Sequence, residues 1–242
     1  MPTEYRKIIY SKYHTTQSGR DKDIEILLHK QADFFSKEIL PFFPDSKKCS
    51  ILDIGAGNGS FLLACKQNGY TNCIGLDLSP EQVKIGQSFG INELLEADAL
   101  NWMKQNPGKY DVVTAFDLVE HLTKDELMEM ISAIVNSLKP GGIFIFRTPN
   151  LDCPLPNPYA RGDFSHETFL NKHSATQLLY ANGFNSVSIS EGLIQTNSPF
   201  KEMVRKSFMG IYRICFKIKL FTLGYVSSDI LITPNLIAVA KK

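Results

Sequence analysis

An α/β fold, in which helices cover both faces of a mostly parallel sheet, is the architecture that this sequence predicts. Between about residues 50 and 150, short apolar runs of strand length alternate with segments of helical periodicity. The connections between them are short, which is typical of parallel strands joined by crossover helices. A glycine-rich loop after the first of these runs supports the same fold class, because it follows a strand and opens a helix.

Each predicted element follows from local sequence. A helix is expected at 22–40 from its apolar spacing, and the prolines of 41–44 end it. Strands are expected at 50–54, 72–78, 93–98, 110–116, 142–148, 186–192 and 236–240. Helices are expected between them at 60–69, 79–90, 99–106, 124–139 and 173–184. Ser79 and Pro80 provide an N-cap and a first-turn proline for one of these helices.

Composition and charge narrow the class of protein. The chain has 242 residues, of which 43% are hydrophobic, enough for one large domain with a substantial core. A net charge of +1 argues against a nucleic-acid partner, which usually requires a basic face. The five cysteines form no CxxC pair, so we expect free thiols. The sequence shows neither a signal peptide nor an apolar run of membrane-spanning length, so we expect a cytoplasmic protein.

The glycine loop LDIGAGNGSF (52–61) predicts a ligand site. Gly55 and Gly57 let the backbone turn tightly and approach a ligand closely. The spacing G-x-G-x-G differs from the G-x-G-x-x-G of dinucleotide-binding proteins. Asp53 precedes the first glycine by two residues, and a carboxylate there suits a ligand that carries an ammonium better than one that carries a pyrophosphate.

Acidic residues also end the next two predicted strands. Asp77 is placed to accept hydrogen bonds from the two hydroxyls of a ribose, and Asp98 from an adenine amino group. The carboxyl ends of neighbouring strands meet at the edge where open α/β sheets bind ligands.

Five motifs in order, ILDIGAGNGSFL, GLDLSPEQV, EADAL, YDVVTAFDLVEHL and LKPGGIFIFRTPN, resemble those of class I S-adenosylmethionine-dependent methyltransferases. The resemblance implies a Rossmann-like, doubly wound, seven-stranded sheet whose last strand is antiparallel. It also implies an S-adenosyl-L-methionine site. The residues expected there are Asp53, Gly55, Gly57, Asp77, Leu78, Asp98, Ala99 and Phe116.

A second cluster is expected on the acceptor side. We expect helical structure after the fourth strand from Asp117, so that Asp117, Glu120 and His121 share one helical face and Glu120 and His121 lie in the first turn. The later segment GDFSHE adds His166. Two roles remain open. His121 or His166, with Glu120, forms a general acid–base site, or Asp117, Glu120, His121 and His166 hold a divalent metal ion.

The pairing of VEHL with GDFSHE resembles methyltransferases of bacterial surface-polysaccharide (O-antigen and capsule) biosynthesis, and more loosely small-RNA 3′-end methyltransferases with a metal site. We therefore expect O-methylation of a sugar or glycan decoration. The alternatives are a quinone-like small metabolite, RNA 2′-O-methylation and a binding protein without catalysis. The expected partner is a small-molecule or glycan acceptor, with no nucleic acid.

The chain is expected to form one methyltransferase domain. Residues 1–48 form an N-terminal helical cap, 49–191 the cofactor-binding core, 192–234 a helical insertion and 235–242 the final strand. Tyr13 and Arg20 are candidates for contact with the cofactor carboxylate or the substrate. The basic and apolar segment 199–221 is interpreted as an ordinary packed helix, as a surface for the inner membrane or a lipid-linked substrate, or as a dimer contact.

Overall fold

A computed structural model describes residues 5, 8–9, 23–155, 160–196, 198–224 and 230–242. Tyr13 and Arg20, the two residues predicted to approach the ligand, lie outside these residues. The same holds for 156–158 of the proline-rich loop that follows the fifth predicted strand.

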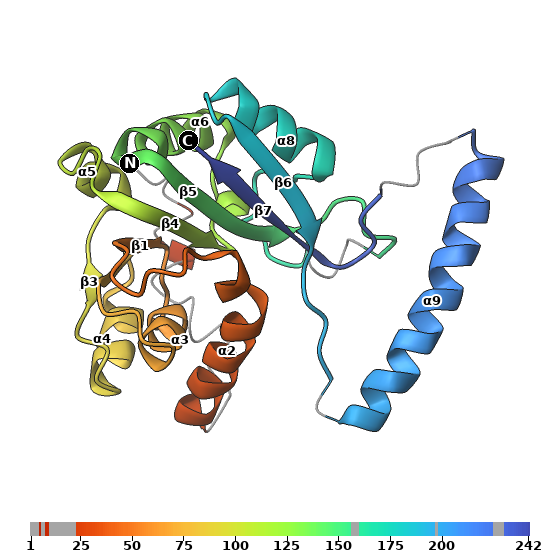
Figure 1. Ribbon diagram of the computed structural model, residues 1–242, viewed down its shortest axis with the longest axis horizontal. Helices are drawn as coiled ribbons and strands as arrows, with labels where there is room; N and C mark the ends of the chain where they lie inside the picture. Colours follow the sequence, from red (N-terminus) through yellow and green to blue (C-terminus); the bar gives the residue numbers. More distant parts are fainter. Residues whose placement is uncertain (1–4, 6–7, 10–22, 156–159, 197, 225–229) are drawn as a thin grey trace.

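The predicted seven-stranded sheet is confirmed (Figure 1). Its strand order is β3-β2-β1-β4-β5-β7-β6, and β7 runs antiparallel to both of its neighbours. The strands are β1 (Ile51–Ile54), β2 (Cys73–Asp77), β3 (Leu94–Glu96), β4 (Tyr110–Phe116), β5 (Leu138–Pro149), β6 (Ser186–Glu191) and β7 (Asn235–Lys241). All four residues of β1 are buried, as expected for a strand that helices cover on both faces.

Two hydrophobic clusters form on the two faces of the sheet. One face is covered by α2 (Ile24–Glu38), α3 (Ser60–Gln67) and α4 (Pro80–Ser88), and the other by α5 (Ala99–Lys104), α6 (Lys124–Ser137) and α8 (Lys172–Ala181). Figure 1 shows the first three helices together on one side of the strands and the other three on the opposite side. Phe35 of α2 and Phe61 of α3 pack in the first cluster, and Ile131 of α6 and Leu179 of α8 in the second.

Side-chain N-caps mark the starts of α4 and α6. The Ser79 hydroxyl accepts a hydrogen bond from the Gln82 amide, so the predicted N-cap of α4 is confirmed. Thr123 and Glu126 form a capping box at the start of α6. The helix expected at 124–139 is confirmed, and it begins at Lys124. The further prediction that helical structure begins at Asp117 is wrong. Asp117 has a left-handed backbone with φ of 52°, and a short 3-10 turn at Val119–His121 precedes the capping box.

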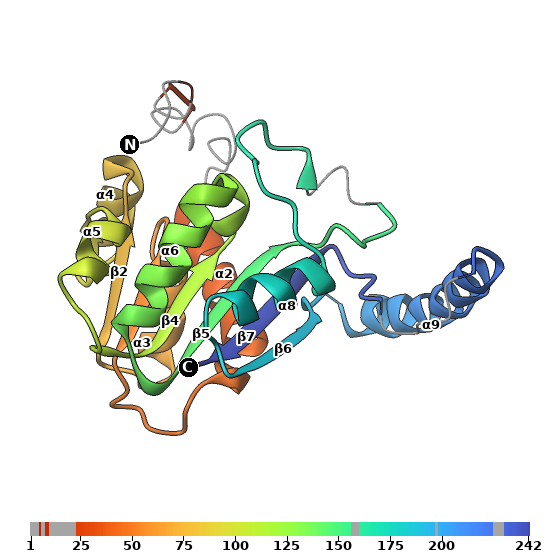
Figure 2. The same ribbon diagram turned by 90° about the horizontal axis from the view of Figure 1, so that it is seen from above.

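A long helix, α9 (Pro199–Thr222), occupies the segment between β6 and β7. It lies beside the sheet and its helices, and Figure 2 shows it projecting from one side in a second view. A 3-10 turn at Leu40–Phe42 follows α2, where the predicted proline stop stands. Among the described helices, none has the length and apolar character needed to cross a bilayer.

Candidate active site

The glycine loop joins β1 to α3 and has the backbone that the sequence predicts. Gly55 and Gly57 have φ of 68° and 54°, a region that other residues rarely adopt. A Cβ atom on Gly55 would lie 3.0 Å from Cδ1 of Leu118. The loop therefore touches the segment between β4 and α6, so the predicted cofactor site and the predicted acceptor site are neighbours.

Asp77 stands at the carboxyl end of β2 and faces this loop. Its Oδ2 accepts a hydrogen bond from the Gly57 amide at 2.7 Å, and its Oδ1 accepts one from the Ser79 amide at 2.8 Å. Burial raises its pKa although both amides favour the charged form. The next residue, Leu78, exposes 56% of its surface at the same edge of the sheet. The fixed carboxylate of Asp77 can accept hydrogen bonds from the hydroxyls of a sugar, and the exposed side chain of Leu78 can pack against a flat base.

Asp98 lies between β3 and α5, as the sequence predicts. One of its oxygens accepts a hydrogen bond from the Asn101 amide at 2.7 Å, so it is the N-cap of α5, and Ala99 is the first residue of that helix. The side chain is exposed. The capping role and a contact with an adenine amino group are compatible, because a carboxylate has four lone-pair positions.

Asp53 is the most deeply buried acid of the predicted cofactor site, at 1% exposed. The β1 register places it between Gly75 of β2 and Thr114 of β4. The Thr114 hydroxyl donates to its Oδ1 at 2.7 Å. Burial raises the pKa of Asp53 to about 8, and the nearby Asp77 carboxyl adds to the increase. In the ligand-free protein Asp53 is therefore largely protonated near neutral pH, and a bound cation would favour its ionised form.

Phe116, the last residue of β4, lies in the core. Its ring centroid is 4.8 Å from the Phe35 ring of α2 and 4.8 Å from the Phe61 ring of α3. Because Phe116 is only 8% exposed, little of its ring is available to a ligand. Its packing mainly fixes the position of the chain that follows β4.

Asp117, the first member of the predicted face, points elsewhere. Because its backbone is left-handed, it shares no helical face with Glu120 and His121. Its carboxylate pairs with the Arg147 guanidinium of β5, which also binds Glu38 of α2 at 3.0 Å. Glu38 in turn accepts a hydrogen bond from the Leu193 amide at 2.8 Å. This network, which we did not predict, ties α2 and the chain after β6 to the ends of β4 and β5.

Glu120, His121 and His166 come together, and each contributes a potential ligand atom within 4.8 Å of the others. The two imidazole rings have centroids 4.6 Å apart at an interplanar angle of 78°. Glu120 and His121 come from the 3-10 turn after β4, and His166 from the segment before α8. The Glu120 carbonyl accepts hydrogen bonds from the Glu167 and Thr168 amides at 2.7 and 3.0 Å, which joins the two segments.

Hydrogen bonds set the orientation of both histidines. Nδ1 of His121 lies 2.9 Å from the Ser165 hydroxyl, which donates its own proton to Asp163 at 2.6 Å. The hydroxyl therefore accepts from His121, and the lone pair of this imidazole is on Nε2. Nδ1 of His166 lies 2.8 Å from the Ala160 carbonyl, which can only accept, so its lone pair is on Nε2 as well.

The electrostatics keep the two buried members of the cluster uncharged. Burial, followed by the charge of His166, lowers the pKa of His121 to about 4. Burial, followed by the Asp117 carboxylate, raises the pKa of Glu120 well above its ordinary value. Glu120 also accepts a hydrogen bond from the Thr148 hydroxyl at 2.9 Å. Such a cluster can accept a proton on an imidazole, or gain negative charge at Glu120 when a cation enters.

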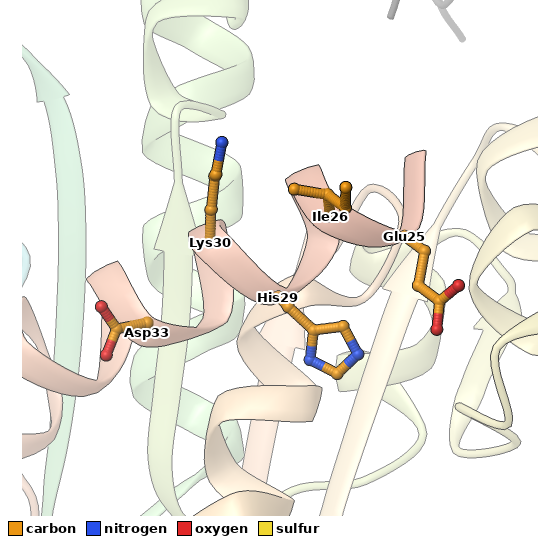
Figure 3. Close-up of a pocket in the computed structure, with 5 residues that line it drawn as sticks. All are labelled: Glu25, Ile26, His29, Lys30 and Asp33. Carbon is orange, nitrogen blue, oxygen red and sulfur yellow. The ribbon is translucent and has the colours of Figure 1, made fainter. Parts of the chain in front are cut away.

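A hollow on the described surface lies along α2. Glu25, Ile26, His29, Lys30 and Asp33 line it, and its volume is about 420 Å³ (Figure 3). All five residues belong to one helix, and none belongs to the glycine loop or to the histidine cluster. This hollow is therefore a surface depression separate from the candidate site.

Comparisons with known proteins agree with this arrangement. A family model described as a methyltransferase domain matches residues 27–189, well over half of the chain. Among curated proteins, a ubiquinone biosynthesis O-methyltransferase of Aliivibrio fischeri is 29% identical over 105 residues, 41% of this chain and 44% of that protein. An ajmaline N-methyltransferase of Rauvolfia serpentina is 34% identical over 100 residues, 38% of this chain and 34% of that protein. The chain thus spans less than half the length of the curated relatives it matches.

Two solved structures share the whole fold. A SAM-dependent methyltransferase from Archaeoglobus fulgidus aligns over 99% of this chain and 100% of its own, with a TM-score of 0.64 and 21% identity. A second, from Thermotoga maritima, aligns over 98% of this chain and 99% of its own, with a TM-score of 0.65 and 14% identity. The family match, the strand order and the glycine loop together identify the chain as a member of the methyltransferase-domain family, with the fold of the class I S-adenosylmethionine-dependent enzymes.

Proposed function

We propose that the protein transfers a methyl group from S-adenosyl-L-methionine to a hydroxyl of a sugar or glycan decoration in surface-polysaccharide biosynthesis. The observation that carries the proposal is the convergence of Glu120, His121 and His166 one turn from Leu118, which packs on the glycine loop. A hydroxyl must lose its proton as it is methylated, and an imidazole of this cluster can accept that proton.

The residues present fit S-adenosyl-L-methionine. Gly55 and Gly57 offer close approach of the backbone, Asp77 the ribose contact, Asp98 the adenine contact and Asp53 a carboxylate for the ammonium. When bound, the cofactor supplies a methyl group on a positively charged sulfonium. Asp53 is buried and Asp77 is half-buried, and burial raises the pKa of both carboxyls, so they gain negative charge most readily when a cationic ligand is next to them.

His166 is the better candidate for the base. It is less buried than His121, and its Nδ1–H donates to the Ala160 carbonyl, which also stabilises the imidazolium that forms. As the acceptor oxygen bonds to the methyl carbon and the carbon–sulfur bond breaks, the hydroxyl proton passes to Nε2 of His166. Burial lowers the pKa of His121 and makes it a weaker base. We therefore assign to His121 and Glu120 the role of orienting the acceptor hydroxyl.

A divalent metal ion in the same cluster is the second candidate mechanism. The observation in its favour is that both imidazoles have their lone pairs on Nε2 and that the donor atoms of three side chains lie within 4.8 Å. Two nitrogens and one carboxylate suit Mn²⁺, Fe²⁺ or Zn²⁺ better than Mg²⁺. A bound ion would lower the pKa of an acceptor hydroxyl. Asp117 is not in this donor set, because it pairs with Arg147.

The acceptor class rests on the motif pair VEHL and GDFSHE, which resembles the surface-polysaccharide subgroup. A quinone-like small metabolite is the alternative that a curated relative favours, since the Aliivibrio fischeri protein is named as a ubiquinone biosynthesis O-methyltransferase. RNA 2′-O-methylation is disfavoured by the net charge of +1.

The test is transfer of radiolabelled methyl to nucleotide sugars and glycan fragments, with demethylated quinone analogues and RNA as comparison panels. Each reaction is run as purified, after EDTA, and after EDTA with Mn²⁺ added back. Transfer to sugars that EDTA does not change supports a histidine base, whereas loss with EDTA and recovery with Mn²⁺ supports the metal. Transfer to quinones or RNA with none to sugars contradicts the proposed acceptor. Replacement of the exposed His173 by Gln is the matched control for His166→Gln.

A further inference from the structure

Among the described residues, the outer face of α9 is apolar and exposed. All 24 residues of this helix are described and none is buried. Large apolar residues lie on one side at steps of three or four positions, with one step of five between Met203 and Phe208, which places them on a single helical face. Their exposed fractions include 69% at Phe200, 60% at Ile211 and 59% at Ile218. The other exposed members of this face are Met203, Phe208, Ile214 and Phe221.

The opposite face of α9 turns toward the rest of the protein. Its residues are half-exposed, and Arg213 forms an ion pair with Glu191 at the end of β6. Glu191 also accepts a hydrogen bond from the Ile232 amide at 2.9 Å. On the same side Arg205 pairs with Glu202, the single acidic residue of the helix. This inward side also carries the half-exposed apolar residues Met209, Phe216 and Leu220, so it is mixed in character, whereas the outward side is apolar and exposed.

Lysines border the apolar face along both of its edges. By helical spacing, Lys201 and Lys219 lie along one edge, and Lys206 and Lys217 along the other. All four are exposed. An apolar strip between two rows of lysines matches a surface that offers hydrocarbon beneath anionic headgroups.

From this face and its charge we infer that α9 is a docking surface for an anionic lipid bilayer, on which the helix lies parallel to the surface. A second copy of this chain fits less well. Pairing of two α9 helices through the apolar face, parallel or antiparallel, brings lysines of one copy beside lysines of the other. Anionic headgroups instead neutralise both lysine rows at once. This inference does not depend on which acceptor the enzyme methylates.

The natural cysteines provide a direct probe. Cys215 lies at the margin of the apolar face and is exposed, whereas the other four cysteines are buried. An environment-sensitive fluorophore on Cys215 of the full chain reports whether this face leaves water. With vesicles of equal phosphatidylglycerol and phosphatidylcholine we expect stronger, blue-shifted emission and co-sedimentation, both weakened as NaCl rises from 50 to 300 mM. With pure phosphatidylcholine we expect much weaker binding.

Two double variants separate the apolar and the charged contributions. Each lysine near an anionic surface contributes about a fivefold increase in affinity, so K201Q with K219Q is expected to weaken binding by about 25-fold. K84Q with K124Q, at exposed positions of α4 and α6, is the matched control and is expected to bind as the wild type does. I211D with I218D is expected to abolish binding, with M128D as its control. Circular dichroism confirms that each variant is folded.

Three outcomes overturn the inference. The first is equal binding to anionic and zwitterionic vesicles, and the second is no binding to either. The third is a blue-shifted label without vesicles together with a dimer mass in light scattering, which assigns the face to a second copy of the chain.

Discussion

Replacement of Asp53 by Asn tests whether burial raises the pKa of this carboxyl, because the variant and the wild-type protein differ by one ionisable group. Burial raises the pKa of Asp53 from 3.8 to about 8, so the folded protein holds a proton there that the unfolded chain releases above pH 3.8. The folded state is therefore favoured at low pH, and this contribution is lost as pH rises toward 8. The Asn variant has no such dependence.

The size of the effect follows from the pH interval. One pH unit between the two pKa values corresponds to about 1.4 kcal/mol, so the variant gains about 3 kcal/mol of stability relative to wild type between pH 5 and pH 7. The new amide N–H group can lack a partner, which costs about 1–3 kcal/mol at every pH. The sign of the difference at one pH is therefore uninformative, and its change with pH is the quantity to measure.

Urea unfolding of both proteins at pH 5, 6, 7 and 8 gives that change. Asp98→Asn is the control for the acid-to-amide change, because Asp98 is exposed and Asn is an equally good N-cap. We also expect the Asp53 variant to bind S-adenosylhomocysteine at least about tenfold more weakly, through loss of a charge-assisted hydrogen bond to the ammonium. A pH-independent stability difference for Asp53→Asn would refute the reasoning.

Three further predictions concern residues around the site. Ser165→Ala removes the hydrogen bond that orients His121, so we expect a lower kcat and an altered pH profile with unchanged affinity for S-adenosylhomocysteine; unchanged kcat and profile would contradict this positioning role. Arg147→Met leaves the buried Glu38 carboxylate without its ion-pair partner and should cost about 3–5 kcal/mol in urea unfolding, and a loss below about 1 kcal/mol would show that the network is dispensable. Gly55→Ala forces a strained φ and a contact at 3.0 Å with Leu118, so cofactor affinity measured by calorimetry should fall at least tenfold, and near wild-type affinity would contradict the close-approach role.

The elements that the sequence predicts well are those whose cause is local. Glycine is the residue that most readily adopts a positive φ, so the residue type at 55 and 57 already indicates the backbone found there. Ser79 and Pro80 specify the start of α4. The start of α6 was predictable too, because Thr123 and Glu126 form a capping-box pattern that is visible in the sequence. The predicted start at residue 124 is therefore correct, whereas the helical turn expected from Asp117 does not form, because Asp117 has a left-handed backbone, which Asp tolerates better than most residues do.

Other features depend on partners distant in sequence. Arg147 binds Glu38, 109 residues away, and Asp117, 30 residues away. The signal in the sequence was one charged residue within a strand of otherwise apolar character, which rarely becomes buried without a partner. The orientation of His121 depends on Ser165, 44 residues later, and its lowered pKa depends on burial that only the folded chain provides. Residue spacing contains neither piece of information.

We propose a division of roles in which the cluster of Glu120, His121 and His166 binds and deprotonates the acceptor, while the glycine loop and its acids bind the cofactor. The most direct test is to measure, for His166→Gln and for wild type, both calorimetric affinity for S-adenosylhomocysteine and methyl transfer to the best acceptor of the panel. We predict unchanged affinity and at least a 100-fold loss of kcat, the lower end of what a positioned base contributes. Full turnover in the variant, or loss of cofactor binding equal to the loss of turnover, would contradict the division of roles.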